Sequence, residues 1–332
     1  MVTRPAHSGQ GPILLLGAPR SGTSWLGKIF DSHPDVLYRH EPDVVLEDDG
    51  LPWICPEVVT EADRRMAEEY LRRLATTATA RTSGKPPFFP KSYRGPMARL
   101  ARIMLMGGLR AAEMCGTAPA RLNRMPVPDL IAAGARSRVR IVVKSNSAHG
   151  RAHVYAQAWP HARFVLILRD PWGYAASIRR GKSIGKMDVP PLQWIPESSV
   201  ARRYGLTEER LATLPELEQL TWNWVISNEK VLLDLEGSAA LKVITYRTLC
   251  EEPMRQTQEL FAFAGLQWNR QTEVFIDRST KSFGPDRYYA VFKNTRDAMN
   301  RWRKDLTSEE QQRILRVLRL SPLLRHCPEL GT

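Results

Sequence analysis

Cysteine is scarce in this 332-residue chain, which contains only Cys55, Cys115, Cys250 and Cys327. The four residues lie far apart, form no CxxC pair and have no histidine nearby at the spacing of a zinc site. This pattern favours reduced structural thiols in a cytoplasm over a disulfide framework. It also gives no reason to expect a metal centre.

Long apolar runs are missing as well. No run reaches about 18 residues, the length that a membrane-spanning helix needs, and only a polar leader precedes Gly11. We therefore expect a cytoplasmic protein without a transmembrane segment or a secretion signal. The hydrophobic content of 43% is enough for a packed globular core.

Acidic residues are outnumbered, with 35 Asp and Glu against 48 Lys and Arg, which gives a formal charge of +13. Such a surface attracts anions, among them nucleotides, phosphates, sulfated glycans and acidic lipids. The basic residues are dispersed among acids and no nucleic-acid-binding motif occurs, so we expect no nucleic-acid partner. Neither charge nor composition indicates an oligomeric state.

Short apolar runs alternate with helical patterns along the chain. The first run, 13–16, is followed by apolar residues at helical spacing from Trp25 to Phe30. Further strand candidates are 139–143, 164–168 and 241–245. This alternation predicts an α/β fold with a central, mostly parallel sheet flanked by helices.

We expect one domain over residues 11–320 with two insertions. The first covers about 50–135 and contains helical stretches near 61–76 and 96–114. The second, about 182–215, is irregular and rich in Pro, Trp and charge. Segments of this kind form lids and acceptor walls in many enzymes, and surface elaboration without a function is the alternative.

The clearest motif joins the first strand to the first helix and reads ILLLGAPRSGTSWLGKIF. Gly17 and Gly22 are spaced as in a phosphate-binding loop, whose backbone N–H groups and helix dipole face an anion. A Walker A loop would have lysine at the position of Thr23. The cation lies instead inside the loop as Arg20, which can form forked bonds to a phosphate or sulfuryl group. Without the lysine and an evident Walker B acid, a magnesium–triphosphate site is not favoured.

A second strand–helix junction reads RFVLILRDPWGYAASIRRG. Its strand is predicted to end at Arg169, and ligands of open α/β sheets bind beyond the carboxyl ends of the strands. Asp170 and Pro171 begin a helix. Ser177 follows about two turns into it, so we expect Arg169 and Ser177 to face one crevice.

Together the two junctions resemble the sulfotransferases that use 3′-phosphoadenosine 5′-phosphosulfate (PAPS). The pattern G-x-P-R-S-G-T-S-W is similar to the family's 5′-phosphosulfate-binding loop. The resemblance implies PAPS contacts from Arg20, Ser21, Gly22, Thr23, Ser24 and Trp25. Arg169 and Ser177 are similar to the family's arginine and serine that grip the 3′-phosphate. The family also implies a P-loop-containing nucleotide-hydrolase-like fold and a reaction without a metal.

Sulfuryl transfer needs a base for the acceptor proton and cations for the charge on the leaving phosphate. The segment DSHPDVLYRHEPD is similar to carbohydrate sulfotransferases and, with a one-residue offset, to tyrosylprotein sulfotransferases, in which a glutamate here is the general base. The resemblance implies Glu41 as the base, with His40 as the alternative. Lys144, at the end of RIVVK, is similar to the family's lysine that reaches the phosphosulfate. With Arg20, it would stabilise the bridging oxygen.

Two later segments, VITYRTLCEEP and YYAVFKNTRDAMNRWRKDL, resemble the family's C-terminal part. They imply that Tyr246 approaches the nucleotide and that Lys293 covers it. A core tyrosine and a solvated lysine are the alternative interpretations of these two residues.

The acceptor is less well determined than the donor, because the two insertions carry no recognised motif and would line its pocket. We expect a hydroxyl of a carbohydrate, a glycosylated natural product or another small molecule. Animal members of the carbohydrate branch carry an N-terminal membrane anchor that is not evident here, which favours a bacterial-type enzyme.

Three alternatives stay open from the sequence. One is a P-loop kinase that uses ATP, and another is a silent nucleotide-binding protein. The third is a sulfotransferase that acts on a lipid head group with peripheral membrane contact, which the apolar and basic stretch 97–114 suggests.

Overall fold

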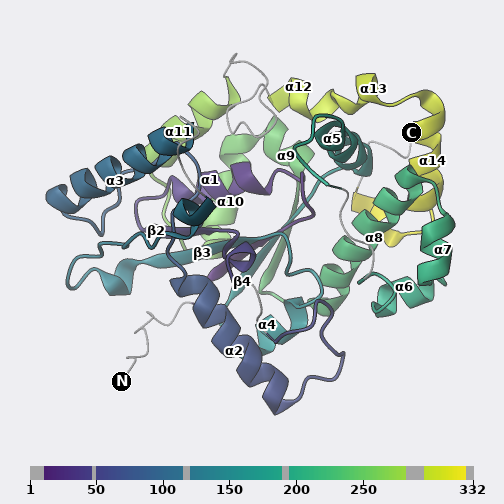
Figure 1. The fold of residues 1–332 in the computed structure, drawn as a ribbon, viewed down its shortest axis with the longest axis horizontal. Helices are drawn as coiled ribbons and strands as arrows, with labels where there is room; N and C mark the ends of the chain where they lie inside the picture. The colour runs from purple at the N-terminus through teal and green to yellow at the C-terminus, as the bar shows by residue number, and fades with distance from the viewer. Residues whose placement is uncertain (1–10, 47–49, 115–119, 189–193, 282–294, 327–332) are drawn as a thin grey trace.

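The computed structural model describes residues 11–46, 50–114, 120–188, 194–281 and 295–326. Five strands form one sheet with the order β2-β3-β1-β4-β5 (Figure 1). They are β1 (Ile13–Leu16), β2 (Val36–His40), β3 (Arg140–Ser145), β4 (Arg163–Leu168) and β5 (Leu241–Thr245). Each pair of neighbours in this sheet is parallel, which confirms the predicted α/β class with a P-loop-like parallel sheet.

β2 is a strand that the sequence does not predict. Its run VLYRH contains two basic residues, which hide the continuous apolar signature of a buried strand. Arg39 is nevertheless 1% exposed, because its Nε donates to Ala75 O at 3.0 Å and its terminal nitrogens bind both carboxylate oxygens of Asp129. Pairing with a carboxylate 90 residues away thus allows a charged residue to be buried within a strand.

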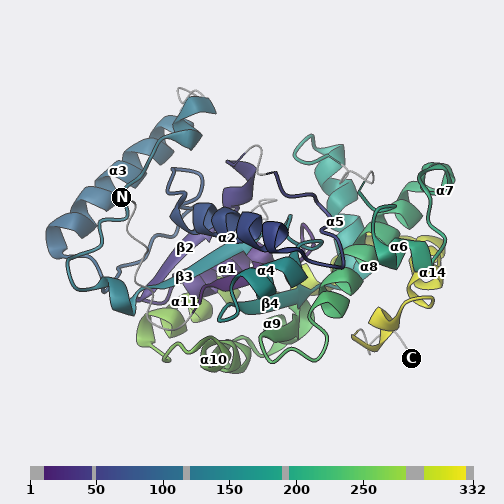
Figure 2. The ribbon, with the colours of Figure 1, turned by 90° about the horizontal axis from the view of Figure 1, so that it is seen from below.

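Both faces of the sheet are buried under helices, as parallel sheets require. Ile13 and Leu15 belong to one apolar cluster, and Leu14 and Leu16 to the other. The first cluster includes α1 (Thr23–Asp31), α9 (Tyr246–Glu251), α10 (Pro253–Ala264) and α11 (Arg270–Thr280). The second includes α2 (Glu61–Thr76), α4 (Ala152–Ala158), α5 (Pro171–Ser183), α8 (Glu216–Asp234) and α14 (Ser308–Leu318). Figure 2 shows the sheet between α2 and α10.

The chain leaves β1 and β4, which are neighbours, in opposite directions. From β1 it runs to β2 at one edge of the sheet, and from β4 to β5 at the other. Such a topological switch point is where open α/β sheets bind ligands. The loop 17–22 follows β1 and Arg169 follows β4, so the two predicted anion-binding junctions meet here.

The first predicted insertion contains α2 and α3 (Pro96–Met114), with the bounds that the sequence predicts. A capping box between Thr60 and Asp63 fixes the start of α2. α3 lies at one end of the molecule, outside the layers that cover the sheet (Figures 1 and 2). The second insertion contains α6 (Ser199–Arg203) and α7 (Glu208–Thr213).

Shorter elements complete the described chain. They are α12 (Thr295–Asn300), α13 (Trp302–Asp305), η1 (Pro42–Val44), η2 (Ala120–Arg124), η3 (Arg136–Arg138) and η4 (Pro322–His326). Within the described ranges, no helix combines the length and apolarity needed to cross a bilayer. The single domain over 11–320, the lid role of the insertions and the cytoplasmic location stay predictions.

The buried pair between Arg39 and Asp129 can be tested by Asp129→Ala. This change leaves a guanidinium buried without its carboxylate, so we expect the free energy of unfolding in urea to fall by about 3 kcal/mol. The control is Asp277→Ala, which removes an exposed pair with Lys281 and should cost less than about 0.5 kcal/mol. Equal losses in both variants would contradict the importance of the buried pair.

Candidate active site

The loop between β1 and α1 approaches its neighbours at distances that only glycine permits. A Cβ at Gly17 would lie 2.9 Å from Ile167 O, and one at Gly22 would lie 2.5 Å from the Tyr246 ring. Gly22 also has a φ of 91°, in the left-handed region that favours glycine. The loop is therefore pressed against β4 and α9.

Arg20 connects the predicted donor-site residues. Its Nε donates to Ser177 Oγ at 3.1 Å, and its carbonyl oxygen accepts from Arg169 Nη1 at 2.8 Å. Arg169 Nη2 donates to Ala298 O at 3.1 Å, and the guanidinium lies 5.0 Å from the ring centroid of Tyr246. Four predicted residues thus meet at the switch point: one from the loop, one directly after β4, one from α5 and one from α9.

The remaining residues of the loop differ in burial. Ser21 Oγ is buried and has no hydrogen-bond partner within the part of the chain that the structure describes, whereas Ser24 is exposed. Trp25 Nε1 donates to Ser279 Oγ at 3.1 Å, and its ring meets Tyr246 edge to face at 6.4 Å. A buried hydroxyl without a partner, inside an anion-binding loop, suits an oxygen of a bound ligand.

A second cluster forms around Glu41, directly after β2. Its Oε1 accepts hydrogen bonds from Lys144 Nζ and from Asn146 Nδ2, the latter at 2.8 Å. Its Oε2 lies 3.8 Å from His40 Nε2 and 3.8 Å from Arg81 Nη2. Asn146 also accepts from Thr23 Oγ1 at 3.2 Å, which links this cluster to the loop.

The charges around Glu41 decide its protonation. Burial by itself raises the pKa of this carboxyl. The ammonium of Lys144, together with the neighbouring His40 and Arg81, lowers it by more than burial raises it, so the pKa falls to about 2. The stabilisation from this ion pair is therefore complete above the ordinary pKa of glutamate and is lost as the pH falls toward 2. Burial, and then Lys144, lowers the pKa of His40 to about 3, so its imidazole is neutral at pH 7.

Backbone strain marks the same two clusters. In the described ranges, the non-glycine residues with positive φ are Arg20, Glu41 and Leu130, with φ of 71°, 46° and 55°. Two of these three are site residues. Such conformations cost about 1–3 kcal/mol each and collect at functional sites, where the surrounding contacts maintain them.

Two residues of this site carry no sequence motif that would assign them. Asn146 lies two positions beyond Lys144, just past the end of β3, which is the only local signal for it. Arg81 comes from the first insertion and has no signal at all. It reaches the site because Thr82 O accepts a hydrogen bond from His40 N at 2.8 Å. The predicted contact Lys293 lies outside the described residues.

Among the described residues, no three His, Cys, Asp or Glu side chains gather as metal ligands would. The expectation of a metal-free reaction stays a prediction.

Comparisons with known proteins identify a family for this chain. A family model described as "Sulfotransferase family" matches residues 12–270. Human carbohydrate sulfotransferase 6 is 24% identical over an alignment 354 residues long, which covers 95% of this chain and 81% of the relative. The nodulation protein NoeE of Sinorhizobium fredii is 24% identical over 317 residues, which cover 90% of this chain and 62% of the relative.

Solved structures give a weaker likeness. The sulfotransferase domain of the olefin synthase from Synechococcus PCC 7002 has a TM-score of 0.46 and 15% identity, and the alignment covers 96% of this chain and 97% of that one. The residues that the family model matches include the loop after β1, the end of β4 and the cluster around Glu41. On that match, which covers well over half of its length, this chain belongs to the sulfotransferase family.

Proposed function

We propose that this protein transfers a sulfuryl group from PAPS to a hydroxyl of a carbohydrate, a glycosylated natural product or another small molecule. The observation that carries the proposal is the position of Glu41, which lies against Lys144 and is joined through Asn146 to the loop after β1. A base, a cation and an anion-binding loop are the parts that sulfuryl transfer needs. The carbohydrate acceptor is suggested by the name of one relative, human carbohydrate sulfotransferase 6.

The donor site in this proposal has two anchors. The loop 20–25 binds the 5′-phosphosulfate, while Arg169 and Ser177 bind the 3′-phosphate. The proximity of Arg20, Arg169 and Ser177 supports this assignment. Both terminal nitrogens of Arg169 donate to backbone carbonyls in the structure. A phosphate would compete well because it carries a negative charge and can accept two parallel bonds from one guanidinium, which a carbonyl oxygen cannot. Tyr246 lines this anchor.

The transfer is an in-line displacement at sulfur. Glu41 takes the proton of the acceptor hydroxyl while the acceptor oxygen forms its bond to sulfur. The bond between sulfur and the bridging oxygen breaks, and its electron pair stays on the leaving phosphate. Lys144 and Arg20 stabilise the charge that develops there.

The ion pair of Lys144 with Glu41 implies an order of events. A carboxylate with a pKa of about 2 is a weak base. The phosphosulfate competes for the ammonium of Lys144, and Glu41 then keeps the burial that raises its pKa while losing the cation that lowers it most. Donor binding therefore makes Glu41 a stronger base, so activation of the acceptor follows binding of the donor.

Two alternatives concern the same site. His40 remains the other candidate base, although its low pKa makes it a weak one and its Nδ1 lies 3.0 Å from Tyr38 OH. A kinase is disfavoured because Thr23, in place of the Walker lysine, bonds to Asn146. A lipid head group stays possible as the acceptor.

Glu41→Gln tests the base. The glutamine keeps the size of the side chain but cannot accept the proton, so we expect kcat to fall by about 10²–10⁴-fold. Initial rates with radiolabelled PAPS and a panel of saccharides measure this, and calorimetry with 3′-phosphoadenosine 5′-phosphate (PAP) should give a Kd no higher than that of the wild type, because glutamine no longer competes as an anion for Lys144. Exposed Glu57→Gln is the matched control. Full turnover in Glu41→Gln, with loss in His40→Gln, would make His40 the base.

Arg169→Ala tests the 3′-phosphate anchor. Loss of charge-assisted hydrogen bonds should raise the Kd of PAP about 10-fold or more, measured by calorimetry, and leave the Kd of adenosine 5′-phosphate nearly unchanged. Arg270→Ala removes an arginine whose side chain is 78% exposed and should change neither value. Equal weakening for both nucleotides would show that Arg169 does not recognise the 3′-phosphate.

A further inference from the structure

α3 presents an apolar face to solvent. Its large apolar side chains that are more than half exposed are Met97 (78%), Leu100 (54%), Ile103 (62%) and Met104 (69%). The opposite side of the helix packs Met106 against Ala80 and Val127. Single exposed apolar residues are ordinary, but four within two turns of one helix form a continuous patch of the kind found at interaction sites.

The charged residues beside this patch are all basic. Between residues 96 and 112 the sequence has three arginines and no acidic residue. Arg99 Nε donates to the carbonyl oxygens of Lys91 and Arg94, and Arg102 Nη1 donates to Pro128 O at 2.7 Å. Among the described residues, neither Arg99 nor Arg102 forms an ion pair with a carboxylate, and the hydrogen bonds named here go to backbone carbonyls.

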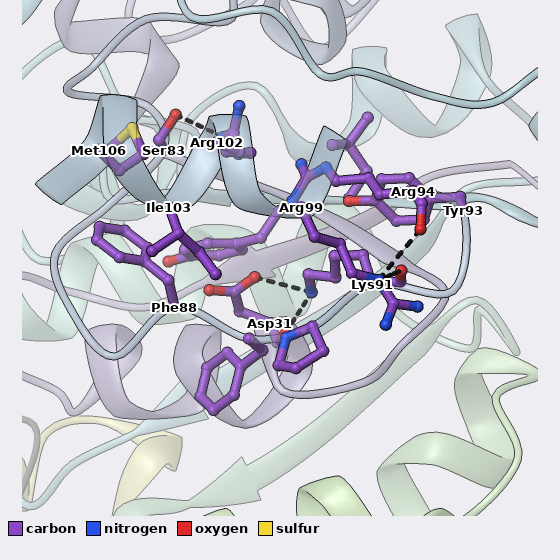
Figure 3. A pocket seen from close by; sticks show the side chains of 14 residues that line it. Asp31, Ser83, Phe88, Lys91, Tyr93, Arg94, Arg99, Arg102, Ile103 and Met106 are labelled. Carbon is purple, nitrogen blue, oxygen red and sulfur yellow. Dashed lines mark hydrogen bonds and ion pairs between the residues drawn. The ribbon is translucent and has the colours of Figure 1, made fainter. Parts of the chain in front are cut away.

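A pocket of about 140 Å³ lies beneath the helix and continues the patch inward. Figure 3 shows Phe88 and Ile103 on one side of it and Tyr93 and Arg94 on the other. The charged side chains in its lining are Asp31, Lys91, Arg94, Arg99 and Arg102. Positive charge is therefore in excess, and the pocket has an apolar and a cationic side.

Arg94 supplies a buried cation with unused donors. It is 8% exposed, its Nε donates to Asp129 O at 2.8 Å, and its guanidinium stacks 5.0 Å from the Tyr93 ring centroid. Its two terminal nitrogens have no hydrogen-bond partner in the described part of the chain. A buried guanidinium is stable when oxygen anions satisfy its donors, so an external anion fits here.

We propose that α3 docks on an anionic bilayer surface. The patch of Met97, Leu100, Ile103 and Met104 enters the interface, and the arginines of the pocket receive the phosphates of lipid head groups. Interfacial helices bind membranes by the same two contributions, buried apolar area and attraction of basic residues to anionic lipid. The formal charge of +13 acts in the same direction.

A second copy of the chain fits this face less well. In a two-fold dimer the same surface faces itself, which would bring Arg99 and Arg102 close to their own counterparts, and residues 96–112 contain no acidic residue to pair with them. A free anion would explain the pocket but leave the apolar patch uncovered. The bilayer accounts for both, and the proposal does not depend on sulfuryl transfer, because none of the residues on which it rests takes part in that reaction.

The experiment is co-sedimentation of the full chain with vesicles of phosphatidylcholine, alone or with about 30 mol% phosphatidylglycerol. We expect binding to the anionic vesicles, weakening as salt is raised because the Debye length shortens. Leu100→Glu should reduce binding at least about 10-fold, because it places a charge in the apolar contact. Leu320→Glu is the matched control, since Leu320 is 63% exposed and lies beyond α14. Arg99→Gln should weaken binding only to the anionic vesicles.

Thermal melting of each variant establishes that it is folded. The proposal is overturned if the wild type binds neither vesicle, or if Leu320→Glu loses as much binding as Leu100→Glu. It is also overturned if ultracentrifugation detects a dimer that Leu100→Glu dissociates while no vesicle binds, which would assign the face to a second copy. If inorganic phosphate raises the melting temperature of the protein but no vesicle binds, the membrane proposal is also overturned, and the pocket is a site for small anions.

Discussion

The ion pair between the buried Lys144 and the partly buried Glu41 is the contact on which the site depends. Lys144 is 1% exposed, so its charge tolerates burial only with a carboxylate or a bound anion beside it. The same two residues are joined by a backbone hydrogen bond from Glu41 N to Lys144 O at 2.9 Å, which fixes the ends of β2 and β3 to each other. A contact that stabilises the free protein thus lies where the donor would have to bind.

The parallel sheet explains why residues far apart in sequence meet. His40 is paired with Lys144 and Leu16 with Ser145, so three strands end at one edge. β4 ends at the same edge, and Arg169 follows it. In open α/β sheets, ligands bind beyond the carboxyl ends of the strands. The loop after β1, Lys144 at the end of β3 and Arg169 after β4 therefore come together there, although no sequence pattern connects them.

The parts of the fold and of the site that the sequence predicts are those with local chemical requirements. Gly17 and Gly22 can be predicted because their neighbours lie too close for any residue with a Cβ. The helices α2 and α3 can be predicted because helical periodicity is a local pattern. β2 is not predicted because its buried Arg39 is neutralised by Asp129, which lies 90 residues away in the sequence. Arg81 is not predicted because it belongs to an insertion that carries no recognised motif. Such pairings depend on tertiary structure, so a single sequence does not contain a pattern for them. The roles of Glu41, Lys144, Arg169 and Ser177 stay proposals.

The measurement that tests the central claim most directly is calorimetric titration of the wild-type protein with PAP, beside ATP with magnesium and adenosine 5′-phosphate. The account predicts a clear preference for PAP, because Arg169 and Ser177 add a second phosphate site to the loop after β1. Equal affinity for PAP and adenosine 5′-phosphate would contradict the 3′-phosphate anchor. Preference for ATP with magnesium would contradict the donor assignment as a whole.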